Sequence, residues 1–397
     1  MQTVYIFTRL KAELIGVQVG MTKQEISLTN MPDSLEKSGM VIQSASQVKP
    51  LSLFTNAHNE GDIVNSLSQA FSLYDLWSRF VRGRNLKLPA NQAPARVIKK
   101  RQFSERVDGI HYEGEFGISP AFMECKDQDY IMWPSDREEK VEAALISLAT
   151  KDKIVKVLSA SSERYAICFT IKELIDVLKS VNQSLSNPEV KESLTILSKS
   201  HLSFMFKVTD DKGSIESREA TVPFIGAIHY SNKRGRSAQK CIVFLNDYMT
   251  QQIESMSYTG FYFNRTQQFS GALPRWLAKR LYQMFRYART DTTYHFTLIS
   301  MMVKFGAITS DEQVATKLVA LRRNMTSAVK DLINEGILKK YSVSSIKNDE
   351  GQVIDNKYVL MPSERFCEEV LALNKHQRKL KEKLKKDSVD IFALEDA

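Results

Sequence analysis

The sequence predicts an α+β protein in which one order of elements (helix, strand, helix, helix, hairpin) occurs twice. Three observations support this prediction. Apolar residues recur at helical spacing in several segments, short β-rich runs follow them, and turn-forming residues separate paired runs. The first copy spans about 136–222 and the second about 273–362. A period this long indicates tandem domains rather than a solenoid, although two unrelated α+β domains remain the alternative.

The second copy is the clearer one. It begins with a helical run over 273–289, followed by a strand-like segment at 294–298 and a short apolar helix ending at 305. A long amphipathic helix is expected over 314–335, ended by Gly336, and two β-like runs at 337–346 and 353–361 close the copy as a hairpin. This is the order of a winged helix, a helix-turn-helix variant that lays the helix before its hairpin in the DNA major groove.

The first copy has the same elements with weaker signals. A helix over 138–150 precedes a strand-like run at 166–169, and Thr170 with Glu173 forms a capping box that opens the second helix. Asn187 is expected to cap the third helix, with Pro188 at its first position. Runs at 204–208 and 220–228 flank 209–214 as a candidate wing.

Composition indicates a globular protein of the reducing cytoplasm. The chain has 397 residues, 43% of them hydrophobic, which is enough for a core. No apolar run approaches the roughly 18 residues of a membrane span. The four cysteines are isolated, so neither a zinc site nor a disulfide framework is expected.

Known catalytic patterns are also absent. No His-Glu-x-x-His segment and no Gly-x-x-x-x-Gly-Lys-Ser/Thr loop occurs, and the six histidines are scattered. The sequence therefore predicts a protein that is not an enzyme and needs no metal or cofactor.

The net charge of +9 is unevenly distributed. Nine Lys and Arg face one acid in 79–106, fourteen face eight in 273–362, and seven face one in 375–386. Concentrated positive charge is typical of proteins that bind the phosphate backbone of DNA, although basic runs are often only solvated surface. In the first of these regions the candidate phosphate contacts are Arg96, Lys99, Lys100 and Arg101.

The long helix of the second copy separates its faces. Val314, Leu318, Leu321, Met325, Ala328 and Leu332 follow a 4-3-4-3-4 spacing and form one stripe expected to be buried. The opposite face presents Thr316, Arg323, Thr326, Ser327 and Lys330, with Arg322 and Asn324 on its flanks. Arg can bond guanine edges and Ser, Thr and Lys can contact bases or phosphates, so this face is a candidate reading surface. A merely polar solvent face is the alternative. Weaker candidates in the first copy are Lys191, Ser193, Thr195 and Lys199.

Two segments carry a resemblance to a known family. The sequence at 243–246, Val-Phe-Leu-Asn, followed by 273–285, Leu-Pro-Arg-Trp-Leu-Ala-Lys-Arg-Leu-Tyr-Gln-Met-Phe, resembles the junction between the two winged helices of plasmid theta-replication initiator (Rep) proteins. The resemblance implies that the second winged helix binds repeated sites (iterons) in double-stranded origin DNA. It also implies a monomer–homodimer equilibrium and recruitment of host initiator, helicase and sliding clamp, with no role for a membrane.

The expected organisation has four parts. Residues 1–106 would form a flexible, partly disordered N-terminal arm with a basic linker, 107–264 the first winged helix, 265–362 the second, and 363–397 a basic C-terminal helix with an acidic tail. Within the arm, Pro50-Leu51-Ser52-Leu53-Phe54 resembles the Gln-Leu-Ser-Leu-Phe peptide with which such initiators bind the clamp. Local packing of Leu51, Leu53 and Phe54 is the alternative.

The sequence therefore favours an initiator that binds iterons, melts the origin locally and recruits host proteins. The main alternative is a winged-helix transcriptional repressor, possibly an autorepressor, bound to a promoter palindrome. A structural scaffold protein is the third possibility. Direct repeats in a footprint would indicate the initiator, a palindrome the repressor, and no specific footprint the scaffold.

Overall fold

The computed structural model mixes helices with antiparallel sheets, as the α+β prediction requires. It describes residues 41–55, 67–71, 74–83, 86–92, 98–107, 110–158, 162–209, 215–231, 240–309 and 316–395, with side chains as far as 382. No helix within these ranges is long and apolar enough to cross a membrane.

The first module is built on a five-stranded antiparallel sheet of order β1-β8-β9-β13-β12. Its strands are β1 (Val41–Ser44), β8 (Ile154–Leu158), β9 (Glu163–Thr170), β12 (Ile228–Tyr230) and β13 (Lys240–Phe244). Ile167 of β9 lies opposite Ile154 on one side and Val243 on the other. All three side chains are fully buried, so this row of apolar contacts forms part of the core.

Helices α4 (Asp136–Leu148), α5 (Ile171–Lys179), α6 (Asn187–Lys199) and α7 (Asp247–Glu254) belong to this module, and η6 (Ala149–Lys153) extends α4. The predicted capping box of α5 is confirmed, because Thr170 Oγ1 accepts from the Glu173 N–H and the Glu173 carboxylate accepts from the Thr170 N–H. For α6 the predicted cap was one residue late. Ser186 is the N-cap and pairs reciprocally with Glu189, which leaves Asn187 inside the helix.

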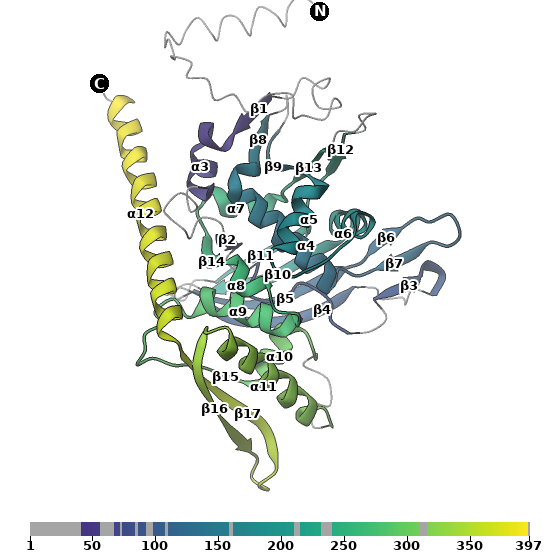
Figure 1. The fold of residues 1–397 in the computed structure, drawn as a ribbon, viewed down its shortest axis with the longest axis vertical. Coiled ribbons are helices and arrows are strands. Elements are labelled where there is room, and N and C mark those ends of the chain that lie inside the picture. Colours follow the sequence, from purple (N-terminus) through teal and green to yellow (C-terminus); the bar gives the residue numbers. More distant parts are fainter. Residues whose placement is uncertain are drawn as a thin grey trace, which may run out of the picture. The chain divides into compact units, whose positions relative to one another are not determined.

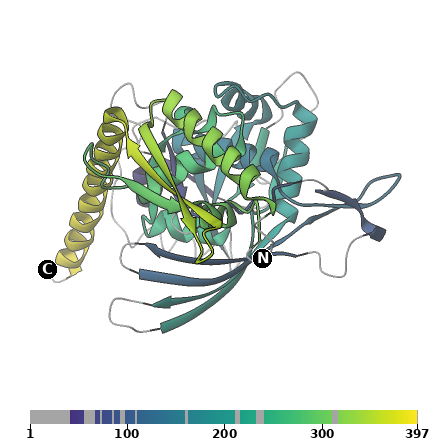
Figure 2. The same ribbon diagram turned by 90° about the horizontal axis from the view of Figure 1, so that it is seen from below.

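A second sheet of four long strands has the order β11-β10-β5-β4. Figure 2 shows these strands, β4 (Lys99–Val107), β5 (Ile110–Ser119), β10 (His201–Thr209) and β11 (Ile215–Pro223), running side by side. The predicted hairpin of the first copy is present as β10 and β11. It pairs with two further strands, and the outermost of these, β4, comes from the segment expected to be an arm.

The prediction of a flexible arm is wrong for the described residues between 41 and 106. Besides β1 and β4, this segment contributes η2 (Ala45–Gln47), α3 (Lys49–Thr55), β2 (Leu67–Phe71), β3 (Lys87–Pro89) and η5 (Ala90–Gln92). Strand β2 pairs with β14 (Tyr258–Tyr262), and β3 joins β7 (Tyr130–Met132) and β6 (Ala121–Met123). Tyr74, Trp77 and Phe80 are buried in the core, which explains why the segment is fixed.

The second module shows the predicted order of elements. It comprises α8 (Phe263–Gln267), α9 (Ala272–Met284), β15 (Tyr294–Thr297), α10 (Leu298–Phe305), α11 (Leu318–Asn334), β16 (Leu338–Lys347) and β17 (Val353–Pro362), and α12 (Glu364–Glu395) follows. The three strands form a sheet of order β15-β17-β16. Figure 1 shows α10 and α11 beside the long hairpin of β16 and β17. The predicted start of α11 at Val314 lies outside the described residues.

Candidate nucleic-acid interface

Helix α11 is held by one side and open on the other. Leu318, Leu321, Met325, Ala328 and Leu332 are all buried, so the described part of the predicted stripe is confirmed. Val329 adds to the buried side, where α11 packs against α9, α10 and the strands β16 and β17. The apolar stripe therefore fixes which face of the helix points outward.

The outward face carries the predicted polar residues. Arg322, Arg323, Asn324, Ser327 and Lys330 are all exposed, and Thr316 is exposed just before the helix begins. Their side chains offer hydrogen-bond donors and acceptors over roughly three helical turns. Their exposure is as predicted, and their contact with DNA remains a prediction.

Thr326 has a different position from the other predicted contacts. It is half-buried, and its Oγ1 lies 3.1 Å from the Tyr358 hydroxyl of β17. The same Tyr358 hydroxyl donates to the Arg322 carbonyl oxygen at 3.3 Å. Thr326 thus helps fix α11 against the hairpin, in addition to any contact with a ligand.

The hairpin of β16 and β17 lies beside this face. Tyr358 stacks on Phe296 with ring centroids 5.4 Å apart and on Tyr341 at 6.4 Å, which anchors the hairpin to β15. Four of its lysines are exposed: Lys339, Lys340, Lys347 and Lys357. The sequence does not indicate these lysines as contacts, because a strand pattern alone does not show where a hairpin will lie. The hairpin that packs against α11 therefore carries four exposed cations, with the exposed Asp349 and Glu350 at its tip.

Val319 was also missed. It is the second residue of α11 and is 83% exposed. An apolar residue in an amphipathic helix is normally assigned to the core, and the valine stands directly after the buried Leu318. The spacing of the stripe is the available signal, because it puts position 319 on the side opposite Leu321 and Met325, and the structure shows the valine pointing outward.

Part of the positive charge of the second module is internal. Arg275 and Arg280 of α9 are each 1% exposed, and they pair with Asp136 and Glu105. Lys279 lies 2.6 Å from Asp75, and Lys304 lies 2.7 Å from Glu105. These four cations hold the second module to α4, β4 and the 74–82 segment, so they are not available to phosphates.

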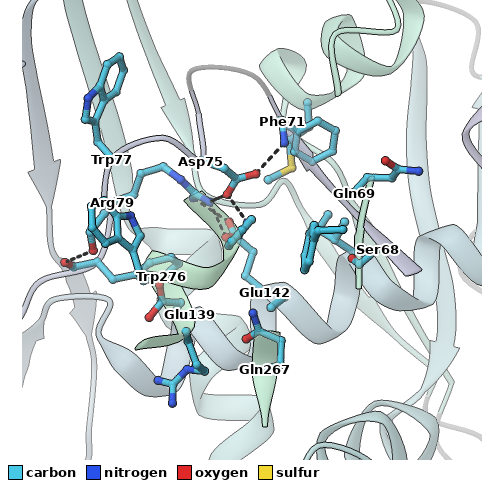
Figure 3. A pocket seen from close by; sticks show the side chains of 18 residues that line it. Ser68, Gln69, Phe71, Asp75, Trp77, Arg79, Glu139, Glu142, Gln267 and Trp276 are labelled. Carbon is cyan, nitrogen blue, oxygen red and sulfur yellow. Dashed lines mark hydrogen bonds and ion pairs between the residues drawn. The ribbon is translucent and has the colours of Figure 1, made fainter. Parts of the chain in front are cut away.

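A buried ion cluster lies where the second module meets α4 and the 74–82 segment (Figure 3). Arg79 donates to Glu142 Oε2 at 2.7 Å and to Asp75 Oδ1 at 3.0 Å, and its guanidinium lies 3.5 Å from the centroid of the Tyr74 ring. Burial raises the pKa of Glu142 above its ordinary value despite the effect of Arg79. Burial acts in the same direction on Asp75, but Lys279 and Arg79 hold its pKa below the ordinary range. The cluster borders a cavity of about 30 Å³. The sequence indicates only a basic linker in this region and not a buried ion cluster.

The Glu105 carboxylate gives a prediction about acid stability. Burial alone would raise the pKa of Glu105. Arg280 and Lys304 lower it by more than burial raises it, so the pKa lies below its ordinary value. A depressed pKa stabilises the fold above the unfolded value of about 4.3, and this contribution is lost as pH falls through the folded pKa. Glu105→Gln should therefore cost about 1.5–3 kcal/mol at pH 7 and progressively less below pH 4. Urea unfolding of both proteins between pH 7 and 3 tests this, and a pH-independent difference would contradict it.

The basic residues near β4 take separate roles. Arg101 donates to the Ser78 and Phe80 carbonyl oxygens, and burial lowers its pKa to about 10. The prediction of a phosphate contact is therefore wrong for Arg101, since its guanidinium is already engaged inside the protein. Lys99 and Lys100 are exposed, with Lys100 Nζ 2.6 Å from Glu115 and Lys99 Nζ 5.2 Å from the Trp133 ring. Arg96 lies outside the described residues.

Helix α6 has little free surface. Ser193 is fully buried and donates to Glu138 Oε1 at 2.9 Å, so its predicted role in DNA binding is wrong. The Thr195 hydroxyl bonds the Lys191 carbonyl oxygen of its own helix, and Lys191 Nζ lies 6.0 Å from the Tyr230 ring. Lys199 is exposed and donates to the Phe122 carbonyl oxygen. Because β6 and β12 also pack on this helix, its outer face is narrower than that of α11.

The predicted clamp-binding peptide lies in the core. Leu51 and Phe54 are 0% exposed and Leu53 is 3% exposed, within α3. A clamp-binding peptide must be extended and accessible to insert its side chains into a partner. The alternative of local packing therefore applies, and this prediction is corrected.

The described residues contain no group of three or more His, Cys, Asp or Glu side chains that could hold a metal ion. The arrangement that the structure does present is a surface helix with cationic and hydrogen-bonding side chains beside a lysine-bearing hairpin. Such a surface can bind a polyanion.

Comparisons with known proteins give distant likenesses. No family model matches the chain, and no curated protein sequence is significantly similar to it. The crystal structure of the RctB domains 2-3 superposes with a TM-score of 0.40 and 11% identity, covering 71% of this chain and 97% of that one. The Pi initiator protein in complex with iteron DNA gives a TM-score of 0.36 and 12% identity, covering 57% of this chain and 91% of that one. An initiator is thus among the similar structures, but TM-scores below 0.5 assign no role to any residue here.

Proposed function

We propose that residues 272–362 form a winged helix that binds duplex DNA through α11, and that the protein is a plasmid replication initiator. The observation that carries this proposal is the exposed polar face of α11, backed by a fully buried stripe and flanked by the hairpin of β16 and β17. In this module β15 is followed by α10, α11 and the hairpin, and β17 of the hairpin pairs with β15. A winged helix requires this topology.

The dimensions and charge of this surface suit the major groove. The groove of B-form DNA is about 12 Å wide and admits one α-helix. Arg323 lies on the outward face, where its planar guanidinium can bond the O6 and N7 atoms of guanine. The exposed lysines of the hairpin would contact phosphates on one side of the groove.

The resemblance at 243–246 and 273–285 favours an initiator over a repressor. In the structure, Asn246 caps α7 through the Met249 N–H, and its amide donates to the Pro223 and Phe224 carbonyl oxygens. This explains why a strand, an asparagine and a helix follow one another at the junction. The proposed activity is binding without a catalytic step, with iteron recognition, origin melting and recruitment of host initiator and helicase, and a monomer–homodimer equilibrium.

The reading face gives the first test. Arg323→Ala should weaken binding to the preferred duplex by about 1–3 kcal/mol and relax the preference at one base pair. Lys330→Ala should weaken all duplexes more evenly and reduce the salt slope. Arg289→Ala is a matched control, because Arg289 is 73% exposed and lies outside α11. Fluorescence anisotropy with full-length protein measures these affinities; if Arg323→Ala and Arg289→Ala behave alike, α11 is not the reading helix.

Footprinting on DNA that flanks the gene separates the initiator from its alternative. Protected direct repeats of one orientation support the initiator. A protected palindrome in a promoter supports the repressor, since a two-fold dimer reads two-fold symmetric DNA. The absence of any specific footprint would leave a scaffold role.

A further inference from the structure

Val319 is an isolated apolar side chain on the reading face. It is 83% exposed. Leu318 and Leu321, which precede and follow it in the sequence and belong to the buried stripe, are both buried. Its exposed neighbours on α11 are Ala320, Arg322 and Arg323. A single exposed valine is common on protein surfaces, so its exposure alone assigns it no contact, and only its place along the helix can indicate one.

Its position aligns it with the predicted DNA contacts. Val319, Arg323, Thr326 and Lys330 follow a 4-3-4 spacing, which places them along one line of the helix at about 100° per residue. Val319 stands at the N-terminal end of this line, in the first turn of α11. The N-terminal residues of a recognition helix are the ones that reach base edges.

We propose that Val319 packs against the C5-methyl group of a thymine in the major groove, and so reads one T·A base pair. This rests on the proposed function. The thymine methyl is the only apolar group that a base pair of unmodified DNA presents in that groove, and small apolar side chains contact it. A protein partner is less well matched, because one valine among arginines and a lysine is not the wide apolar patch that protein interfaces use.

The spacing along the helix makes the inference more specific. Four residues of α-helix span about 6 Å, and successive base pairs are about 3.4 Å apart along each strand. Val319 and Arg323 should therefore address base pairs about two steps apart. The preferred duplex should contain a guanine contacted by Arg323 and a thymine about two base pairs away.

The test uses full-length protein and a duplex selected from a random pool. Each thymine is replaced singly by deoxyuridine, which removes only the methyl group. One such replacement should weaken binding of the unaltered protein by about fourfold to fifteenfold, the effect of losing one to two buried CH₂ contacts. Val319→Ala should bind the original duplex more weakly by the same factor. Its affinity should not change when that thymine is replaced by deoxyuridine. Val319→Ile, which keeps the apolar contact, should retain the discrimination.

Val41→Ala is the matched control, because Val41 is 57% exposed and lies in β1 of the five-stranded sheet. It should respond to deoxyuridine as the unaltered protein does. The inference is overturned if Val319→Ala and the unaltered protein respond alike to every deoxyuridine replacement. That is also the result expected if Val319 contacts a protein instead of DNA. If no duplex is enriched, or if Arg323→Ala keeps full specific affinity, the proposed function itself fails. If a duplex is enriched and bound through Arg323, while Val319→Ala does not change the response to deoxyuridine, that result removes only this inference and leaves the proposed function standing.

Discussion

Phe54→Ala is expected to destabilise the protein by about 3–5 kcal/mol, the usual range for truncating a buried phenylalanine. Phe54 is 0% exposed and lies between two other rings. Its ring stacks on Phe71 of β2 at 6.3 Å and meets Tyr258 of β14 edge-on at 5.1 Å. Truncation would leave a cavity between α3 and a strand pair whose partners are far apart in the sequence. Urea-induced unfolding followed by circular dichroism measures the free energy of unfolding.

Phe122→Ala provides the control, because Phe122 of β6 is 45% exposed. The same truncation there should change the free energy of unfolding much less. If Phe54→Ala were as mild as Phe122→Ala, α3 would be an accessible peptide after all. The measurement thus separates a core role of residues 51–54 from the clamp-binding role that their sequence suggested.

The second module could be predicted because its signals are local. The stripe from Leu318 to Leu332 repeats at helix spacing, and the sequence on either side supplies a stop at Gly336 and two β-like runs. Gly336 adopts a positive φ of 69°, as a residue ending a helix often does. Each of these signals depends on residues a few positions apart, so the chain need not be folded for them to be read.

The N-terminal segment could not be predicted because its partners are remote. Strand β2 pairs with β14, with Phe71 opposite Tyr258, and no local pattern in 67–71 specifies that register. Short strands of this kind have no turn to connect them to their partner. The sequence therefore predicts an arm here, although the apolar residues of this segment complete the core.

The positions of charged residues could not be predicted for a related reason. The sequence places Arg79 and Arg101 beside a basic linker, yet Arg79 is buried against Glu142 and the half-buried Arg101 donates to carbonyl groups distant in the sequence. A sequence shows the sign of a charge but not whether a carboxylate distant in sequence lies beside it. Val319 differs from these residues, because the stripe spacing of α11 already puts it on the outward face, where the structure shows it exposed.

Glu142→Ala is expected to have an effect as large as that of Phe54→Ala, through charge rather than volume. The substitution leaves the Arg79 guanidinium, 4% exposed, with Asp75 as its remaining carboxylate in the buried cluster. Removing one partner of a buried ion pair typically costs about 3–5 kcal/mol, because the other charge stays out of water without compensation. A surface pair gives the control. Asp291→Ala breaks the exposed pair with Arg289 and should cost less than about 1 kcal/mol.

The double variant Arg79→Met with Glu142→Leu tests the cause of that loss. It removes both charges and fills their volume with apolar atoms, while Asp75 keeps Lys279 at 2.6 Å and the Phe71 N–H at 2.7 Å. If desolvation of an unpaired charge is responsible, the double variant should be more stable than Glu142→Ala alone, although it carries two substitutions. If instead the two losses add, the cluster is stabilised by its individual contacts. Since Arg79, Glu142 and Lys279 come from the 74–82 segment, α4 and α9, the double variant also shows whether charge is needed to join these elements or only complementary packing.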